Sequence, residues 1–244
     1  MTAPIAERIA ASLVESGAQS IVLVGSRATG KASAESDVDL AVIGDGPSYR
    51  LQIDDGLLVS VGWATPDEQR RRLYDPDWLG THVPGWRQAV VLHDPTGIAA
   101  EIKAEAVRWD WNPVAARCDE AAVARVAGLA EEVHKLATAL QEKSVLAAAV
   151  QRSIIALRLP HAIALRRRIL YGSENHLWEL VACELGNGWR SAQSQALGLG
   201  VVSLDASCKA ALCLFELAAE ELRELFDERQ LIVVEHALQR AEAL

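Results

Sequence analysis

The chain has 244 residues, half of them apolar, and a formal net charge of -9. A chain of this length can bury one large core or two modest ones, and the length favours two domains. The acidic balance argues against a protein that gains its affinity by neutralising many phosphates along DNA or RNA. Extended nucleic acid is therefore not an expected partner.

Neither a targeting signal nor a structural metal site is evident. The opening stretch MTAPIAERIAASLVESG lacks the basic start, apolar core and cleavage site of a secretory signal. No run approaches the roughly 18 apolar residues of a membrane span. We therefore expect a cytoplasmic protein without a membrane partner. No Cys-x-x-Cys or Cys/His ligand spacing occurs, so reduced thiols are expected at Cys118, Cys183, Cys208 and Cys213.

The first 111 residues predict a mixed α/β domain. Helical spacing of apolar residues alternates with short β-like runs, and the turn Asp54-Asp55-Gly56 between two such runs indicates a hairpin. The expected elements are a helix over 5–17, strands over 20–24, 38–43, 51–53 and 57–63, a helix over 66–74, a strand over 89–93 and a helix over 97–109.

From residue 112 onward alanine, leucine, glutamate and arginine dominate, which predicts an all-α domain. Breaks are expected at Pro160 and at the glycine-containing turns. The expected helices cover 119–142, 144–159, 161–171, 174–185, 189–196, 205–226 and 229–243. The fold class is thus α+β: a mixed sheet with flanking helices over 1–111, followed by a helical bundle over 112–244.

Two neighbouring strands carry the residues of a candidate site. An apolar run ends in Gly25-Ser26, and ten residues later the next strand begins with Asp37-Val38-Asp39. Alternate side chains of a strand share a face, so the two carboxylates lie about 7 Å apart on one side. Such a pair suits Mg²⁺, which prefers oxygen ligands and bridges carboxylates to substrate phosphates. Gly25 and Ser26 suit a phosphate, because glycine allows close backbone approach and serine adds a hydroxyl and an N–H.

This arrangement resembles the DNA polymerase β-like nucleotidyltransferase superfamily, whose signature is an apolar strand, Gly-Ser, about ten residues and Asp-x-Asp. The resemblance implies that Asp37 and Asp39 are catalytic and hold two Mg²⁺ ions. It implies that Gly25 and Ser26 bind the nucleotide phosphates, with Arg27 and Lys31 adding positive charge.

The third acid of active family members is missing. Their next strand carries an acidic residue, and Ser60 stands at that place in LLVSVGW. Three alternatives remain open. Asp54 or Asp55 of the hairpin could turn inward, or the helical domain could supply a base from Glu132, Glu179 or Glu184. Otherwise the protein binds nucleotide without transferring it.

The two-part layout resembles the kanamycin and lincosamide nucleotidyltransferases. That resemblance implies transfer of a nucleoside monophosphate, with AMP from ATP expected, to a hydroxyl of a small molecule such as an antibiotic, or of a protein. It assigns dimerisation and acceptor binding to the helical domain, so a homodimer is expected. Negative charge would suit a cationic acceptor. The alternative is a non-catalytic nucleotide-binding or dimerising protein.

Three further patterns have simpler interpretations. Arg229 and His236 fit the loose Arg-x-His spacing of helical nuclease toxins, a pattern that arises easily by chance. The run 166–168 of arginines is expected to fan out into solvent. Packing is the expected role for most of the tryptophans near the end of the first domain, Trp63, Trp78, Trp86, Trp109 and Trp111.

Overall fold

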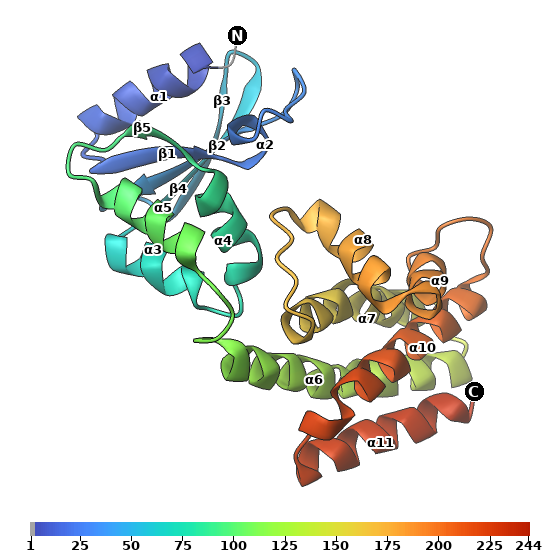
Figure 1. Ribbon diagram of the computed structural model, residues 1–244. Helices are drawn as coiled ribbons and strands as arrows, with labels where there is room; N and C mark the ends of the chain where they lie inside the picture. The colour runs from blue at the N-terminus through green and yellow to red at the C-terminus, as the bar shows by residue number, and fades with distance from the viewer. Residues whose placement is uncertain (1–2) are drawn as a thin grey trace. The chain divides into compact units, whose positions relative to one another are not determined.

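The computed structural model describes residues 3–244, which form two compact units. The first unit runs to Pro113 and also contains Leu170–Ser173. The second comprises Val114–Ile169 and Glu174–Leu244. In Figure 1 the first unit is blue to green and contains the sheet, whereas the second is helical. The boundary between the two units in the described chain thus follows residue 113, whereas the sequence predicted it after residue 111.

A five-stranded mixed sheet forms the centre of the first unit, in the order β3-β4-β2-β1-β5. The parallel pair is β2 with β4, and all other neighbouring strands are antiparallel. The strands are β1 (Ser20–Val24), β2 (Val38–Ile43), β3 (Tyr49–Asp54), β4 (Leu57–Ala64) and β5 (Val90–His93). The sequence predicted all five strands. The predicted ranges are shorter than the observed ones for β3 and β4 and longer for β5.

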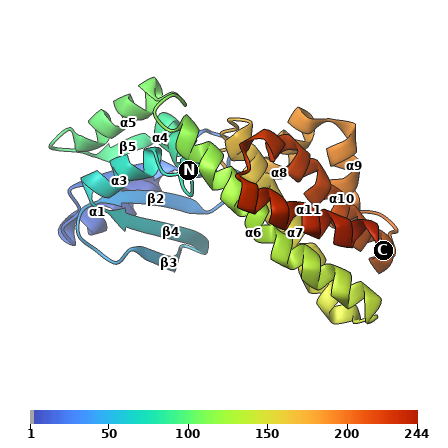
Figure 2. The same cartoon turned by 90° about the horizontal axis from the view of Figure 1, so that it is seen from below.

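Helices cover the two faces of the sheet unequally. The first helix, α1 (Ala3–Glu15), packs on one face through Ala6, Ile9, Ala10 and Leu13. On the other side lie α3 (Pro66–Leu73), α4 (Leu79–Gln88) and α5 (Ile98–Arg108), as Figure 2 also shows. Helices α4 and α5 contact β1, so they cover the β1 end of this second face.

Helix α4 is absent from the predicted elements. Its sequence LGTHVPGWRQ contains two glycines and Pro84, which are poor helix formers. Burial of Leu79, Val83 and Trp86 stabilises it in spite of this composition. The carbonyl of Gly80 also accepts hydrogen bonds from the N–H groups of Tyr171 and Gly172. Packing therefore decides the structure of this segment.

The second unit contains six helices longer than one turn among its described residues. They are α6 (Ala115–Gln141), α7 (Val145–Arg166), α8 (Glu174–Leu185), α9 (Asn187–Ala196), α10 (Leu204–Leu222) and α11 (Glu228–Glu242), with a short 3₁₀ turn at Arg223–Leu225. The predicted break at Pro160 is wrong, because α7 continues through it. Proline costs one backbone hydrogen bond there, and burial of Pro160 between Leu159 and Ile163 offsets this loss.

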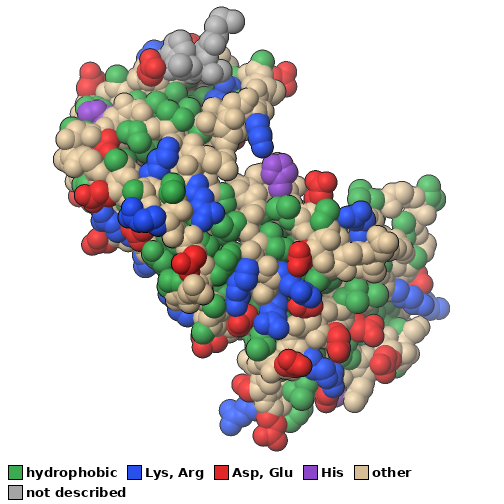
Figure 3. Space-filling view, viewed as in Figure 1, with side chains coloured by type: hydrophobic (Ala, Val, Ile, Leu, Met, Phe, Trp, Pro, Cys, Tyr) green, Lys and Arg blue, Asp and Glu red, His purple; other side chains and the backbone are tan. Residues whose placement is uncertain are grey.

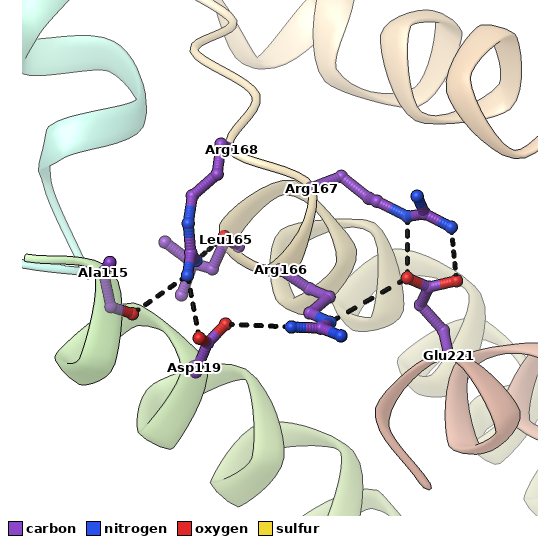
Figure 4. Close-up of polar contacts among 7 residues, drawn as sticks. All are labelled: Ala115, Asp119, Leu165, Arg166, Arg167, Arg168 and Glu221. Carbon is purple, nitrogen blue, oxygen red and sulfur yellow. Dashed lines mark hydrogen bonds and ion pairs between the residues drawn. The ribbon is translucent and has the colours of Figure 1, made fainter. Parts of the chain in front are cut away.

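The arginine run at the end of α7 does not fan out as expected. Figure 4 shows that Arg166, Arg167 and Arg168 converge on two carboxylates. Arg168 Nη2 lies 2.8 Å from Asp119 Oδ2 of α6, and Arg167 Nη2 donates to Glu221 Oε2 of α10 at 2.7 Å. These ion pairs connect the end of α7 to α6 and α10. Arg168 lies beyond the end of α7 and has a φ of 58°, so its side chain does not follow the helical spacing.

The charges on the visible surface are mixed, and three of the tryptophans near the end of the first domain are buried. No described helix is both long and apolar enough to cross a membrane. On the face shown in Figure 3, acidic and basic side chains are interspersed over the helical unit. Packing is confirmed for Trp63, Trp86 and Trp109, which are buried, whereas Trp78 is 45% exposed beneath the guanidinium of Arg72.

Candidate functional site

The centre of the candidate site is the point where β1 ends beside the start of β2. The strands are antiparallel, and their register pairs Val24 with Asp39. Gly25 follows directly with φ of 73°, a left-handed conformation that favours glycine. A Cβ atom on Gly25 would overlap Asp39 Oδ2. Glycine is thus required twice, by its backbone conformation and by the carboxylate packed against it.

Ser60 is the neighbour of Asp39 on the other side. The parallel register of β2 and β4 pairs these two residues, and Ser60 Oγ donates a hydrogen bond of 2.6 Å to Asp39 Oδ1. A neutral hydroxyl therefore lies where the sequence comparison called for a third acid. Asp39 is held between Gly25 on one side and Ser60 on the other.

The environment of Asp39 opposes its ionisation. Burial is the main cause of a raised pKa, and the negative charge of Asp37 raises this pKa further. The hydrogen bond from Ser60 and the positive charge of Arg27 act in the opposite direction without cancelling the effect. A cation beside the two carboxylates would relieve their repulsion, so their arrangement suits a metal ion.

Arg27 closes the loop between the two strands. Its guanidinium donates to the backbone carbonyls of Ala34, Ser36 and Asp37, with Nε to Asp37 O at 2.7 Å. Its Nη1 is buried and makes no hydrogen bond within the described chain. From the sequence, Arg27 was expected either to add charge to the phosphates or to be an exposed basic side chain, and this positioning of Asp37 was missed. The loop between Gly25 and Asp37 gave no signal from which such carbonyl contacts could be found.

Ser26 lies in the short helix α2 (Gly25–Ala28), and Lys31 lies in the loop that follows it. The carbonyl of Ser26 accepts hydrogen bonds from Lys31 N–H and Thr29 Oγ1, which holds the turn after Gly25 in shape. The Ser26 hydroxyl makes no hydrogen bond within the described chain and is partly exposed, so it is available to a ligand. The side chain of Lys31 is exposed. Both residues thus lie on the short connection between β1 and β2 that Gly25 begins.

The hairpin aspartates do not replace the missing acid. Asp54 ends β3 and Asp55 lies in the turn, and both accept from Arg8 Nη2 of α1 at 2.8 and 2.7 Å. In the register of β3 and β4, Asp54 pairs with Leu57, which precedes Ser60 by three residues. The other sequence candidates lie in the second unit, Glu132 in α6 and Glu179 and Glu184 in α8. Glu132 lies 4.0 Å from Lys135 Nζ.

The donor set around Asp39 fits one divalent cation that shares its ligands with phosphate. No group of three or more His, Cys, Asp or Glu side chains suited to a metal occurs in residues 3–244. Two carboxylates with water and phosphate oxygens are a usual Mg²⁺ environment. A second ion would lack the charged ligand that Ser60 replaces.

The toxin-like pair is not a catalytic arrangement in this structure. His236 of α11 packs against α6, with its Nδ1 3.0 Å from His134 Nε2 and the two rings stacked. Arg229 lies in the first turn of α11 and is exposed. The spacing of Arg229 and His236 is therefore explained by the packing of a surface helix.

Comparisons with known proteins agree with this geometry. Residues 6–95 match the family model described as "Nucleotidyltransferase domain", and this segment contains the Gly25-Ser26 and Asp37-Val38-Asp39 spacing. No protein with a curated description matches the chain. The crystal structure of a nucleotidyltransferase-like protein from Exiguobacterium sibiricum 255-15 resembles it with a TM-score of 0.52 and 16% identity. That match covers 98% of this chain and 88% of the other, and shows a shared fold.

Proposed function

We propose that the protein is a Mg²⁺-dependent nucleotidyltransferase that moves a nucleoside monophosphate from a triphosphate to a hydroxyl group. The single observation that supports it best is the contact of the Asp39 carboxylate with Gly25 of the Gly-Ser turn, inside a matched nucleotidyltransferase domain. A phosphate held by the turn would lie directly beside the two carboxylates. ATP is the expected donor, and AMP the expected group.

Each residue of the turn has a role in binding the triphosphate. Gly25 has no side chain, so phosphate oxygens can approach the backbone closely. Ser26 offers a hydroxyl that makes no hydrogen bond within residues 3–244, and exposed Lys31 offers a positive charge. Arg27 holds Asp37 in place through its backbone carbonyl. These contacts bind and orient the substrate before transfer.

Asp37 and Asp39 would hold Mg²⁺, which would neutralise charge on the phosphates during transfer. In the reaction a bond forms between the acceptor oxygen and the α-phosphorus, and the bond from that phosphorus to the β-phosphate oxygen breaks. Pyrophosphate leaves, and the hydroxyl proton passes to water or to a base. Ser60 cannot serve as that base at neutral pH, so we expect slower transfer than with an acid at position 60.

The acceptor is proposed to be a small molecule or a protein. The two-unit layout supports a comparison with the kanamycin and lincosamide nucleotidyltransferases, and on that comparison the second unit assists acceptor binding and dimerisation. The interspersed charges in Figure 3 give that face no continuous basic surface for extended nucleic acid.

The test is release of pyrophosphate from each labelled triphosphate in the presence of Mg²⁺ and a panel of hydroxyl acceptors. Asp39→Asn should abolish release. Asp45→Asn is the matched control, because Asp45 is exposed on the loop after β2. Equal release by both variants would contradict the proposal.

Ser60 favours a second candidate function, that of a nucleotide-binding protein without transferase activity. Its hydroxyl donates a hydrogen bond to Asp39 Oδ1 and supplies no negative charge to a metal ion. Thermal stabilisation by Mg²⁺-triphosphate without pyrophosphate release would support this candidate. The absence of both effects would contradict both functions.

A further inference from the structure

The edge strand β3 presents its apolar side chains on the open face of the sheet. The register pairs Tyr49 with Gly62, Leu51 with Ser60 and Ile53 with Leu58. Directly paired residues share a face, and Ser60 is itself paired with Asp39. The three side chains of β3 therefore lie on the same side of the sheet as the candidate site.

These side chains are exposed to an unusual degree for their type. Tyr49 is 60%, Leu51 53% and Ile53 69% exposed, and Leu58 beside them is 42% exposed. On the side where α1 packs, Gln52 and Asp54 are less exposed, whereas Arg50 is exposed. An antiparallel strand normally turns its apolar residues to the core and its polar residues to water. In β3 this pattern is reversed.

The exposure of the apolar face of β3 follows from the register of the whole strand and is not limited to one residue. A shift of β3 by one residue would exchange the two faces of the strand. The observed register instead places four apolar side chains, those of Tyr49, Leu51, Ile53 and Leu58, in one group, here called the β3 patch. A contiguous exposed apolar group of this kind indicates a binding surface.

The geometry of transfer identifies the occupant of the β3 patch. The Gly25-Ser26 turn follows β1, on one side of Asp39, and Ser60 lies on β4, on the other side. The attacking and leaving oxygens lie roughly in line on opposite sides of the transferred phosphorus. With the leaving pyrophosphate at Gly25-Ser26, the attacking hydroxyl must approach from the β4 and β3 side.

We propose that the acceptor is a hydroxyl compound with an apolar body, which lies over the β3 patch while its hydroxyl reaches the α-phosphate beside Asp39. This inference rests on the proposed transferase function. The hydroxyl oxygen bonds to the α-phosphorus, pyrophosphate leaves, and the proton goes to water. The product is a phosphodiester of the apolar alcohol or phenol with the nucleoside.

The dimensions of the β3 patch limit the size of that body. Leu51 lies two strands away from Asp39, which is about 10 Å across the sheet. Tyr49 and Ile53 are separated by about 13 Å along the strand. A ring system or an alkyl-substituted ring would fill this surface and still bring its hydroxyl to the site.

The same surface disfavours a polycationic acceptor. The β3 patch contains no acidic side chain, and the carboxylate nearest to it along β3, Asp54, is paired with Arg8. Several ammonium groups would have to be desolvated against leucine, isoleucine and tyrosine without a partner, which is unfavourable. An aminoglycoside is therefore a poor match for this face.

The test uses the full chain with Mg²⁺, ATP, and 4-alkylphenols from methyl to butyl, with kanamycin as the cationic comparison. The KM for the phenol should fall by about twofold to fourfold for each added methylene. Leu51→Ser and Ile53→Ser should each raise the KM for 4-butylphenol and flatten this dependence, without a matching rise in the KM for ATP. Val107→Ser is the matched control, because Val107 is 59% exposed on α5.

A second measurement separates this inference from the proposed function. Binding of 4-butylphenol is measured by equilibrium dialysis with Mg²⁺ and a non-hydrolysable triphosphate. Binding that Leu51→Ser weakens and Val107→Ser leaves intact supports the apolar site, even if no pyrophosphate is released and transfer fails. Transfer to kanamycin alone, equal in wild type and Leu51→Ser, would overturn the inference and leave the transferase intact. A dimer in sedimentation analysis that Leu51→Ser abolishes would also overturn it, since a second copy would then cover the patch.

Discussion

At Asp39 the proposed metal-binding position carries a cost to stability. Its raised pKa means that the folded state holds a proton there more tightly than the unfolded state does. The contribution of Asp39 to stability is therefore fully present below the unfolded pKa and is lost as the pH rises through the folded pKa. Carboxylates with a raised pKa are common at ligand sites, which agrees with the proposed role of Asp39.

Asp39→Asn should stabilise the free protein at pH 7 by on the order of 1 kcal/mol, because the amide removes a buried charge next to Asp37. The asparagine oxygen can still accept from Ser60. Urea unfolding at pH 7 measures the difference, which should shrink as the pH falls. Stabilisation by Mg²⁺-triphosphate should disappear in this variant. A less stable variant at pH 7 would contradict the account.

Gly25 and Gly30 provide a matched comparison at one backbone conformation. Their φ values are 73° and 72°, but a Cβ at Gly30 meets nothing within 4 Å whereas one at Gly25 meets Asp39. Gly25→Ala and Gly30→Ala should both lose about 1 kcal/mol from backbone strain. Only Gly25→Ala should also displace Asp39 and abolish triphosphate binding. Equal effects of the two substitutions on binding would show that the Gly25 contact has no functional role.

At the scale of elements, a partly buried histidine of α4 connects α4 to α3. His82 Nε2 lies 3.0 Å from the Gln69 carbonyl, and Trp86 Nε1 donates to Gln69 Oε1 at 3.3 Å. Burial is the main cause that lowers the pKa of His82 to about 4, and the positive charge of Arg72 acts in the same direction. The hydrogen bond with the Gln69 carbonyl acts in the opposite direction without cancelling these effects, so protonation is resisted in the folded state.

This environment predicts acid sensitivity. The stability that His82 contributes is present above its unfolded pKa of about 6.5 and is lost as the pH falls towards 4. Between pH 7 and pH 5 the wild type should lose about 2 kcal/mol more than His82→Gln, which cannot take up a proton. Urea unfolding at the two pH values tests this difference. An equal loss in both proteins would assign the acid sensitivity to other groups.

Elements with clear periodicity were predictable from the sequence, and those determined by packing were not. Short β-like runs indicated all five strands, and the Asp54-Asp55-Gly56 turn indicated the hairpin. Helix α4 and the continuation of α7 through Pro160 depend on burial that local sequence does not reveal. The alternation in β3 was visible, but the face that each set of residues occupies depends on pairing with β4.

At the scale of the whole molecule, spacing predicted the position of the candidate site better than its chemistry. The distance from Gly25 to Asp39 along the chain was sufficient to place them together, because two adjacent antiparallel strands bring these positions side by side. The hydrogen bond of Ser60 with Asp39, the Arg27 contacts and the β3 patch depend on side-chain geometry across several strands. The convergence of Arg166, Arg167 and Arg168 likewise depends on how three helices meet.

The central claim is that Asp37 and Asp39 hold a divalent cation together with a triphosphate at Gly25-Ser26. Electron paramagnetic resonance of Mn²⁺, titrated into the full chain with a non-hydrolysable ATP analogue, tests it directly. We expect Mn²⁺ to be bound by the wild type and by Asp45→Asn, with binding lost in Asp39→Asn. Binding that is equally strong in Asp39→Asn, or absent from the wild type, would contradict the account.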